Sequence, residues 1–141
     1  MKASFEEKSV WIQLGGLSAT LIVYFYIAGK LLSAGVTLLV PFVPIFAIAT
    51  ALLVGLLVFG HIVAAAVARP ERHDERDRLI AWRAEHNSSW ILAVGVLSGV
   101  ACMVLGIGTV WIANWLIFTL FLSEIAKLVF QIIYYRRGTE G

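Results

Sequence analysis

Residues 31–68 read LLSAGVTLLVPFVPIFAIATALLVGLLVFGHIVAAAVA and contain no Asp, Glu, Lys or Arg. As a single helix this stretch would be about 57 Å long, almost twice the roughly 30 Å of a bilayer's hydrocarbon core. Pro41 and Pro44 divide it, because proline removes a backbone donor and disfavours helix in the residue before it. The stretch therefore predicts a loop or short interfacial helix at about 30–43, followed by a membrane span at about 44–68.

The composition of the whole chain agrees with a membrane protein. Of its 141 residues 60% are hydrophobic and 14% are charged, whereas an ordinary soluble domain has about 25% charged residues. The charges are clustered and long uncharged stretches separate them, which predicts an all-α integral membrane four-helix bundle as a single domain. The net charge of +2 gives no reason to expect nucleic acid, and the single cysteine, Cys102, cannot form an internal disulfide.

Apolar stretches predict three further spans, at about 10–28, 90–107 and 110–135. Because no small-residue cleavage site follows the first apolar run, we expect the first span to be retained. The segment between the second and third spans begins with Pro70, which suits a first helical turn. That segment predicts a short cytoplasmic amphipathic helix at about 70–87.

The basic residues predict the orientation of the spans. They lie before the first span, between the second and third, and after the fourth, while the first loop has only Lys30 and the third loop has none. Because Lys and Arg stay on the cytoplasmic side, both termini and the middle segment are expected in the cytoplasm. An even number of spans, four, satisfies this expectation.

Two pairs of short segments are similar to each other. EEKSVWI (6–12) resembles EHNSSWI (85–91), and VFGHIV (58–63) resembles VFQIIY (129–134). Two tandem helical hairpins in the same orientation would produce this similarity, as parallel repeats do in other membrane proteins. Chance similarity between apolar helices is the alternative.

Glu124 and Lys127 stand inside the last predicted span, in LFLSEIAKLVFQ (120–131). A charge near the bilayer centre costs about 2.5–3.5 kcal/mol on insertion scales. Residues three apart share a helical face, so Lys127 leans back toward Glu124, and Gln131 continues the stripe. We expect an intramembrane ion pair or a shared proton that faces the bundle or a partner subunit. The pair would act as a structural clasp, as a relay for protons or ions, or as the counter-charge of a ligand.

Further polar and small residues lie within the predicted spans. His61 could hydrogen-bond to the Glu124 stripe; a haem would need a second axial histidine, for which His86 is the nearest candidate, and we expect no cofactor. Small residues at four-residue spacing let helices approach closely. They predict packing within the bundle or contact with a second copy of the chain, and they are Ala47, Ala51, Gly55, Gly60, Ala64, Ala68, Gly95 and Gly99.

The charged middle segment supports two interpretations. Residues 69–86 carry five basic and five acidic residues, which argues against a patch for anionic lipids, since such a patch needs an excess of Lys and Arg. A salt-bridged solvated helix is one interpretation, and a docking surface for a cytoplasmic protein is the other. His73 and Asp77 lack further ligands at metal spacing, so no metal is predicted. The docking candidates are Asp74, Glu75, Arg76, Arg78 and Trp82.

The chain has no Gly-rich phosphate loop, no His-Glu-x-x-His helix and no recognisable Ser–His–Asp set. We therefore expect no enzyme and no catalytic residue. The leading hypothesis is a non-enzymatic interaction or regulatory module that binds a membrane or cytoplasmic protein, or itself. The alternative is a small homo-oligomeric transporter or channel, coupled to protons or ions, in which Glu124 titrates.

Two segments carry a resemblance to a known family. DERDRLIAWRAE (74–85) and SEIAKLVFQIIYYRRG (123–138) resemble an uncharacterised family of small bacterial four-helix predicted membrane proteins. Members similarly have an acidic-arginine motif entering the third helix and a Glu-x-x-Lys helix running into a Tyr-Arg-Arg-Gly end. The resemblance covers chiefly the second half. It implies a bacterial inner-membrane location and gives weight to Asp74, Glu75, Arg76, Arg78, Glu124 and Lys127.

Overall fold

The computed structural model describes residues 5–67 and 75–137. In chain order its elements are α1 (Phe5–Ser33), the 3-10 turn η1 (Val40–Phe42), α2 (Val43–Val67), α3 (Glu75–Val104) and α4 (Thr109–Arg137). The described ranges contain no strand. Each of the four long helices includes a segment long and apolar enough to cross a membrane. The prediction of an all-α four-helix bundle is confirmed.

The prolines act at the start of α2. Pro41 lies in η1, and α2 begins at Val43 with Pro44 in its first turn. Proline is tolerated there because the first backbone N–H groups of a helix have no partner within the helix. The predicted break in the long apolar stretch is therefore a turn at residues 34–39 followed by the single 3-10 turn.

The two hairpins close with the same kind of turn. Gly35 has a φ of 79° and Gly106 a φ of 73°, and each is followed by a residue whose N–H bonds back to the carbonyl five positions earlier, Val36 to Leu31 and Ile107 to Cys102. This is a Schellman motif, which needs the left-handed conformation that glycine adopts without strain. The two glycines are 71 residues apart, as are the similar segments VFGHIV and VFQIIY.

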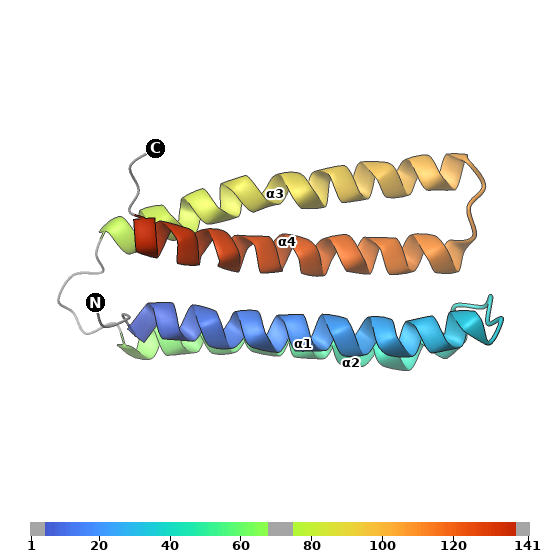
Figure 1. Cartoon of the computed structure of the whole chain (residues 1–141), viewed down its shortest axis with the longest axis horizontal. Coiled ribbons are helices and arrows are strands. Elements are labelled where there is room, and N and C mark those ends of the chain that lie inside the picture. The colour runs from blue at the N-terminus through green and yellow to red at the C-terminus, as the bar shows by residue number, and fades with distance from the viewer. Residues whose placement is uncertain (1–4, 68–74, 138–141) are drawn as a thin grey trace.

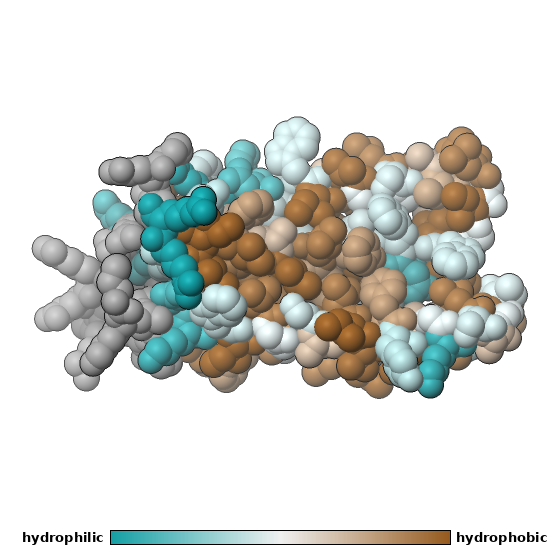
Figure 2. All heavy atoms as spheres, viewed as in Figure 1, coloured by the Kyte–Doolittle hydropathy of each residue, from teal (hydrophilic) through white to brown (hydrophobic). Residues whose placement is uncertain are grey.

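The helices run antiparallel and share one charged end. α1 and α3 begin, and α2 and α4 end, on the same side of the molecule (Figure 1). Hydrophilic side chains gather there, and much of the remaining face shown is hydrophobic (Figure 2). Arg136 Nε donates to Glu7 Oε1 at 3.3 Å, tying the end of α4 to the start of α1.

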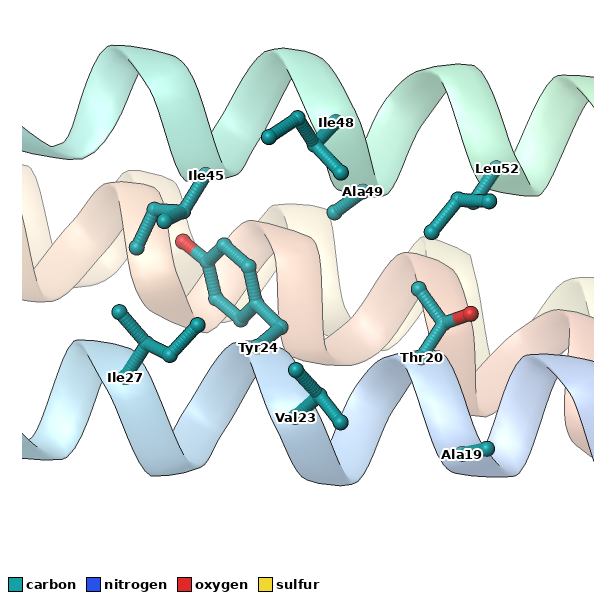
Figure 3. A pocket seen from close by; sticks show the side chains of 9 residues that line it. All are labelled: Ala19, Thr20, Val23, Tyr24, Ile27, Ile45, Ile48, Ala49 and Leu52. Atoms are coloured by element: carbon teal, nitrogen blue, oxygen red, sulfur yellow. The ribbon is translucent and has the colours of Figure 1, made fainter.

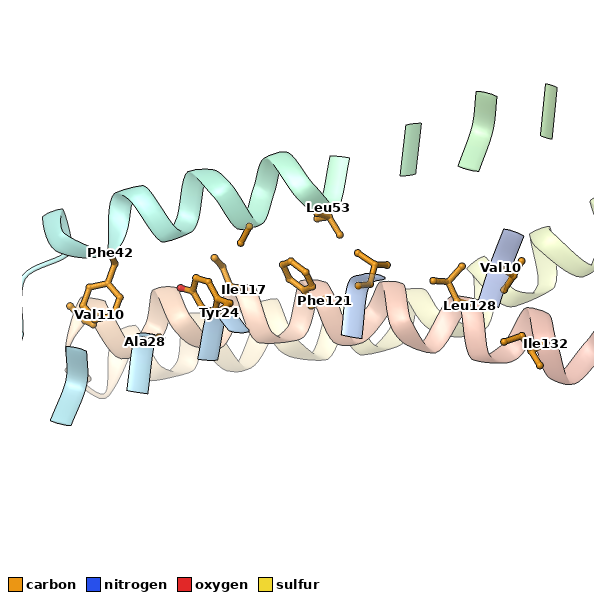
Figure 4. Close-up of a cluster of buried hydrophobic side chains, with 12 residues drawn as sticks. Val10, Tyr24, Ala28, Phe42, Leu53, Val110, Ile117, Phe121, Leu128 and Ile132 are labelled. Carbon is orange, nitrogen blue, oxygen red and sulfur yellow. The ribbon is translucent and has the colours of Figure 1, made fainter. Parts of the chain in front are cut away.

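α1 and α4 are the inner helices of the packing order, since α1 contacts α2 and α4, and α4 contacts α1 and α3. The main apolar cluster is built from α1, α2, α4 and η1 (Figure 4). It includes Leu17, Phe42 and Phe121, each almost fully buried. α3 contributes no residue to this cluster.

α3 instead packs on α4 through small side chains. A Cβ added at Gly95 would lie 2.4 Å from Thr119 Cβ, and one added at Gly99 would lie 2.9 Å from Leu116 Cδ2. Trp115 Nε1 donates to the Gly95 carbonyl at 3.1 Å and to Ser98 Oγ at 2.9 Å. The two helices therefore approach as closely as small-residue interfaces allow.

α3 is one unbroken helix from the charged segment into the apolar one. From Glu75 on, the amphipathic helix expected at about 70–87 and the span expected at about 90–107 are parts of this one helix. Ser88 Oγ donates to the Glu85 carbonyl and Ser89 Oγ to the His86 carbonyl, at 3.0 and 2.7 Å. Because these hydroxyls are satisfied by the preceding turn, the polar residues between the two segments do not end the helix. Residues 70–74 lie outside the described residues.

Candidate functional site

The centre of the candidate site is the pair formed by Glu124 and Lys127. Lys127 Nζ contacts Glu124 Oε2, and the two side chains are only 20% and 21% exposed. Glu124 Oε2 is itself buried and accepts no well-directed hydrogen bond among the described residues. Its neighbour is the Lys127 ammonium, so the contact is a salt bridge within α4.

The pair lies between two packed faces of α4. The adjacent residue Ser123 contacts α3, since its Oγ donates to the Ser88 carbonyl at 3.2 Å. Phe121 and Leu128, three before and four after Glu124, belong to the apolar cluster with α1 and α2. The pair therefore sits at the edge of both contacts, which explains its partial burial.

Its depth follows from the helix geometry. Glu124 precedes Arg136, at the charged end of α4, by twelve residues, which corresponds to about 18 Å. Ser88 of α3 bonds to the neighbouring Ser123, so it lies at nearly the same depth. Polar residues that we placed outside the third span thus stand beside the pair.

Other polar contacts lie between this level and the charged end. Asn87 Nδ2 donates to Tyr134 Oη at 2.6 Å, linking α3 to α4. Gln13 Nε2 donates to Ser9 Oγ at 3.3 Å within α1, and its amide lies where a Cβ on Gly60 of α2 would fall. We call Ser88, Asn87, Ser123, Glu124, Lys127 and Tyr134 the polar layer.

Gln131 and His61 were predicted to lie beside the pair, and the structure describes the side chain of Gln131 but not that of His61. Gln131 is half-buried in α4, on the turn after Lys127. His61 lies in α2, directly after Gly60, but its side chain is outside the described residues, so its contact with the stripe stays a prediction.

A second buried polar contact lies toward the other end of the bundle. Tyr24 Oη donates to Asn114 Oδ1 at 2.9 Å, and Asn114 Nδ2 donates to the Val110 carbonyl at 2.8 Å. Both polar groups of the asparagine side chain are therefore bonded. This contact links α1 to α4.

The docking candidates that the structure describes share one exposed face. Glu75, Arg78 and Trp82 are spaced three and four apart in α3 and are all exposed. Trp82, 64% exposed, stacks on His86 one turn later, with 5.7 Å between ring centroids. The buried residues Ile80 and Ala84 lie on the other side of the helix. Asp74 and the side chain of Arg76 are outside the described residues.

The small-residue stripes separate into two kinds. Gly95 and Gly99 contact α4, and Gly60 contacts α1. Ala47, Ala51 and Gly55 of α2 are exposed, and nothing lies within 4 Å of a Cβ added at Gly55. The buried glycines therefore suit packing inside the bundle, and the exposed small residues of α2 remain available for contact with a second copy, which stays a prediction.

The described residues offer no cluster of three or more His, Cys, Asp or Glu side chains that could hold a metal ion. Cys102 is free and half-buried.

Comparison with known proteins finds no matching family model, no similar curated protein and no similar solved structure. The fold and the site therefore define the protein only as a class: a small all-α protein with four helices able to cross a membrane and a charged pair inside the last of them.

Proposed function

We propose that this chain is a multi-pass protein of the bacterial inner membrane that acts, without enzymatic activity, as an interaction or regulatory module. Its charged end faces the cytoplasm and carries the docking surface, which we define as Glu75, Arg78 and Trp82 of α3. The observation that carries the proposal is the exposure of all three on one helix face, opposite the buried residues Ile80 and Ala84.

The orientation rests on where the basic side chains lie. Lys8, Arg78, Arg83, Arg136 and Arg137 all lie near the shared helix ends, and Lys30 lies toward the opposite end. Lys and Arg are retained on the cytoplasmic side during insertion. The resemblance of DERDRLIAWRAE and SEIAKLVFQIIYYRRG to small bacterial membrane proteins supports the choice of membrane.

The internal pair fits a structural role within such a module. Lys127 neutralises Glu124 inside the last span, so neither charge needs to leave the bundle. An ion pair on one helix removes much of the cost of two separate charges in a medium of low dielectric constant. It also fixes which side of α4 can face lipid.

Site-specific photocrosslinking in native membranes tests the docking surface. A photoreactive residue at Arg78 should give a discrete adduct with a cytoplasmic protein, and the adduct should weaken when Trp82→Ala or Glu75→Lys is added. The matched control is the same photoreactive residue at Arg137, which is also exposed at the charged end. Equal adducts at both positions, or an adduct indifferent to both substitutions, would refute the proposal.

A second candidate function is supported by one observation. The Glu124 side chain is only 21% exposed within an apolar helix, and the polar layer runs from its depth toward the charged end. This arrangement would suit a proton- or ion-coupled transporter or channel in which Glu124 titrates. Flux into proteoliposomes should then be lost in Glu124→Gln, and flux that survives this substitution unchanged would dismiss the idea.

A further inference from the structure

A pocket of about 260 Å³ lies between α1 and α2, away from the polar layer and the docking surface (Figure 3). Its walls are almost entirely apolar. Nine side chains line it: Ala19, Thr20, Val23, Tyr24 and Ile27 from α1, and Ile45, Ile48, Ala49 and Leu52 from α2. We propose that this pocket binds one acyl chain of a membrane lipid.

The polar groups of the pocket disfavour a polar ligand. Only Thr20 and Tyr24 carry side-chain oxygens there, and both hydroxyls already donate their hydrogen, Thr20 to the Gly16 carbonyl at 2.8 Å and Tyr24 to Asn114 at 2.9 Å. Each hydroxyl can still accept, but the pocket side chains offer no free donor, so a headgroup, sugar or charged molecule would lose most of its hydration without replacement, at a cost of several kcal/mol. A hydrocarbon chain loses nothing of this kind.

The shape of the pocket suits an extended chain. It runs from Ala19 to Ile27 along α1, about 12 Å at 1.5 Å per residue. The side chains of α1 and α2 face each other across it (Figure 3). A thin chain that lies parallel to the two helices fits between them.

The medium around the pocket supplies such a chain. Both helices can cross a membrane, and Val23, Ile48 and Leu52 are exposed, so the pocket opens sideways. Ala19 and Ala49 leave space between bulkier neighbours, and the Tyr24 ring lies between the two helices (Figure 3). A chain held there would pack against both α1 and α2, unlike a chain that touches the outer face of α3 alone.

Photolabelling can separate a bound chain from ordinary surrounding lipid. The protein is reconstituted into vesicles of phosphatidylethanolamine and phosphatidylglycerol that include a phospholipid with a diazirine in one acyl chain. Insertion is then mapped by peptide mass spectrometry. We expect at least threefold more insertion per residue at Val23, Ile48 and Leu52 than at comparably exposed Val94 and Val100 of α3.

Ala19→Phe fills the pocket from an exposed position and should lower pocket labelling to the level of α3. Ala101→Phe, exposed on α3, is the matched control and should leave pocket labelling unchanged. Ala49→Leu fills the pocket from the opposite wall and guards against a local fault of the first variant. Unchanged α3 labelling and far-ultraviolet circular dichroism establish that each variant is folded.

Three results would overturn the proposal: equal labelling of the pocket and α3, no labelling of the pocket, or pocket labelling that survives both filling variants. The second result, combined with a crosslink between two copies of the chain through Ile48, would instead assign the pocket to a contact between copies. None of these outcomes depends on whether a cytoplasmic partner binds α3.

Discussion

Replacing Gly95 by alanine should loosen α3 from α4. The added methyl would lie 2.4 Å from Thr119 Cβ, an atom fixed to the backbone of α4 that cannot rotate away. Ordinary contact begins near 3.4 Å, so the helices must separate by about 1 Å. The Trp115 Nε1 bond to the Gly95 carbonyl, now 3.1 Å, would then exceed hydrogen-bond length.

The expected loss is about 2 kcal/mol of unfolding free energy. Overpacking of a close contact costs about 1–3 kcal/mol, and the lost interhelical hydrogen bond adds about 0.6 kcal/mol. Alanine returns about 0.5–1 kcal/mol because it favours helix over glycine. Gly55→Ala is the control: nothing lies near its added methyl, so this variant should be slightly stabilised.

Equilibrium unfolding in mixed micelles of increasing dodecyl sulfate content measures both variants, with circular dichroism for the helices and tryptophan emission for the α3–α4 contact. Thr119→Gly should partly rescue Gly95→Ala, because it removes the side chain that the added methyl would meet, with a coupling of about 1 kcal/mol or more. If Gly95→Ala is as stable as Gly55→Ala, the close α3–α4 contact described here is wrong.

Three further predictions use other contacts. Lys127→Met leaves Glu124 without its cation and should destabilise the protein by at most about 3–5 kcal/mol, the cost of breaking a fully buried pair. Adding Glu124→Gln should recover most of this loss in the same unfolding assay. A double variant no more stable than Lys127→Met alone would contradict the pairing. Tyr24→Phe removes the hydroxyl that bonds α1 to α4 and should cost about 0.6 kcal/mol, with about 1.7 as the upper limit; a larger loss would mean that the ring itself had shifted. In intact cells of a cysteine-free background, Thr37→Cys should react with an impermeant thiol reagent and Asp77→Cys should react only after permeabilisation; the reverse pattern would overturn the orientation.

Much of the fold was predictable, because the length of an apolar stretch and the position of a proline constrain the chain locally. An uncharged stretch of 38 residues is too long to cross the membrane once, and Pro41 and Pro44 indicate where the chain must turn. The helix that begins at Val43 agrees with this. The closeness of Glu124 and Lys127 was likewise predictable, since residues three apart on a helix are neighbours wherever the helix packs.

The continuation of α3 through Ser88 and Ser89 was not predictable from polarity alone. Polar residues usually indicate the end of a span, but serine can bond to the carbonyl of its own preceding turn and remain in the helix. The useful signal was the absence of any proline or glycine between residues 75 and 94. Nothing in the sequence indicated the hydrogen-bond partners of Asn87 and Asn114, because each partner, Tyr134 and Tyr24, lies in another helix.

The sequence alone determined the number of helices, the turn at the prolines and the pairing of charges on one helix. Each of these features depends on chain length or on near neighbours in the chain. Only the tertiary structure decided that α4 lies between α1 and α3, that Gly95 meets Thr119, and that a pocket opens between α1 and α2. The physical reason is that lipid is as apolar as a helix interface. Apart from the stripe of Glu124 and Lys127 on α4, a span has few polar residues to show which side is packed, so neighbours are chosen by shape and by a few hydrogen bonds.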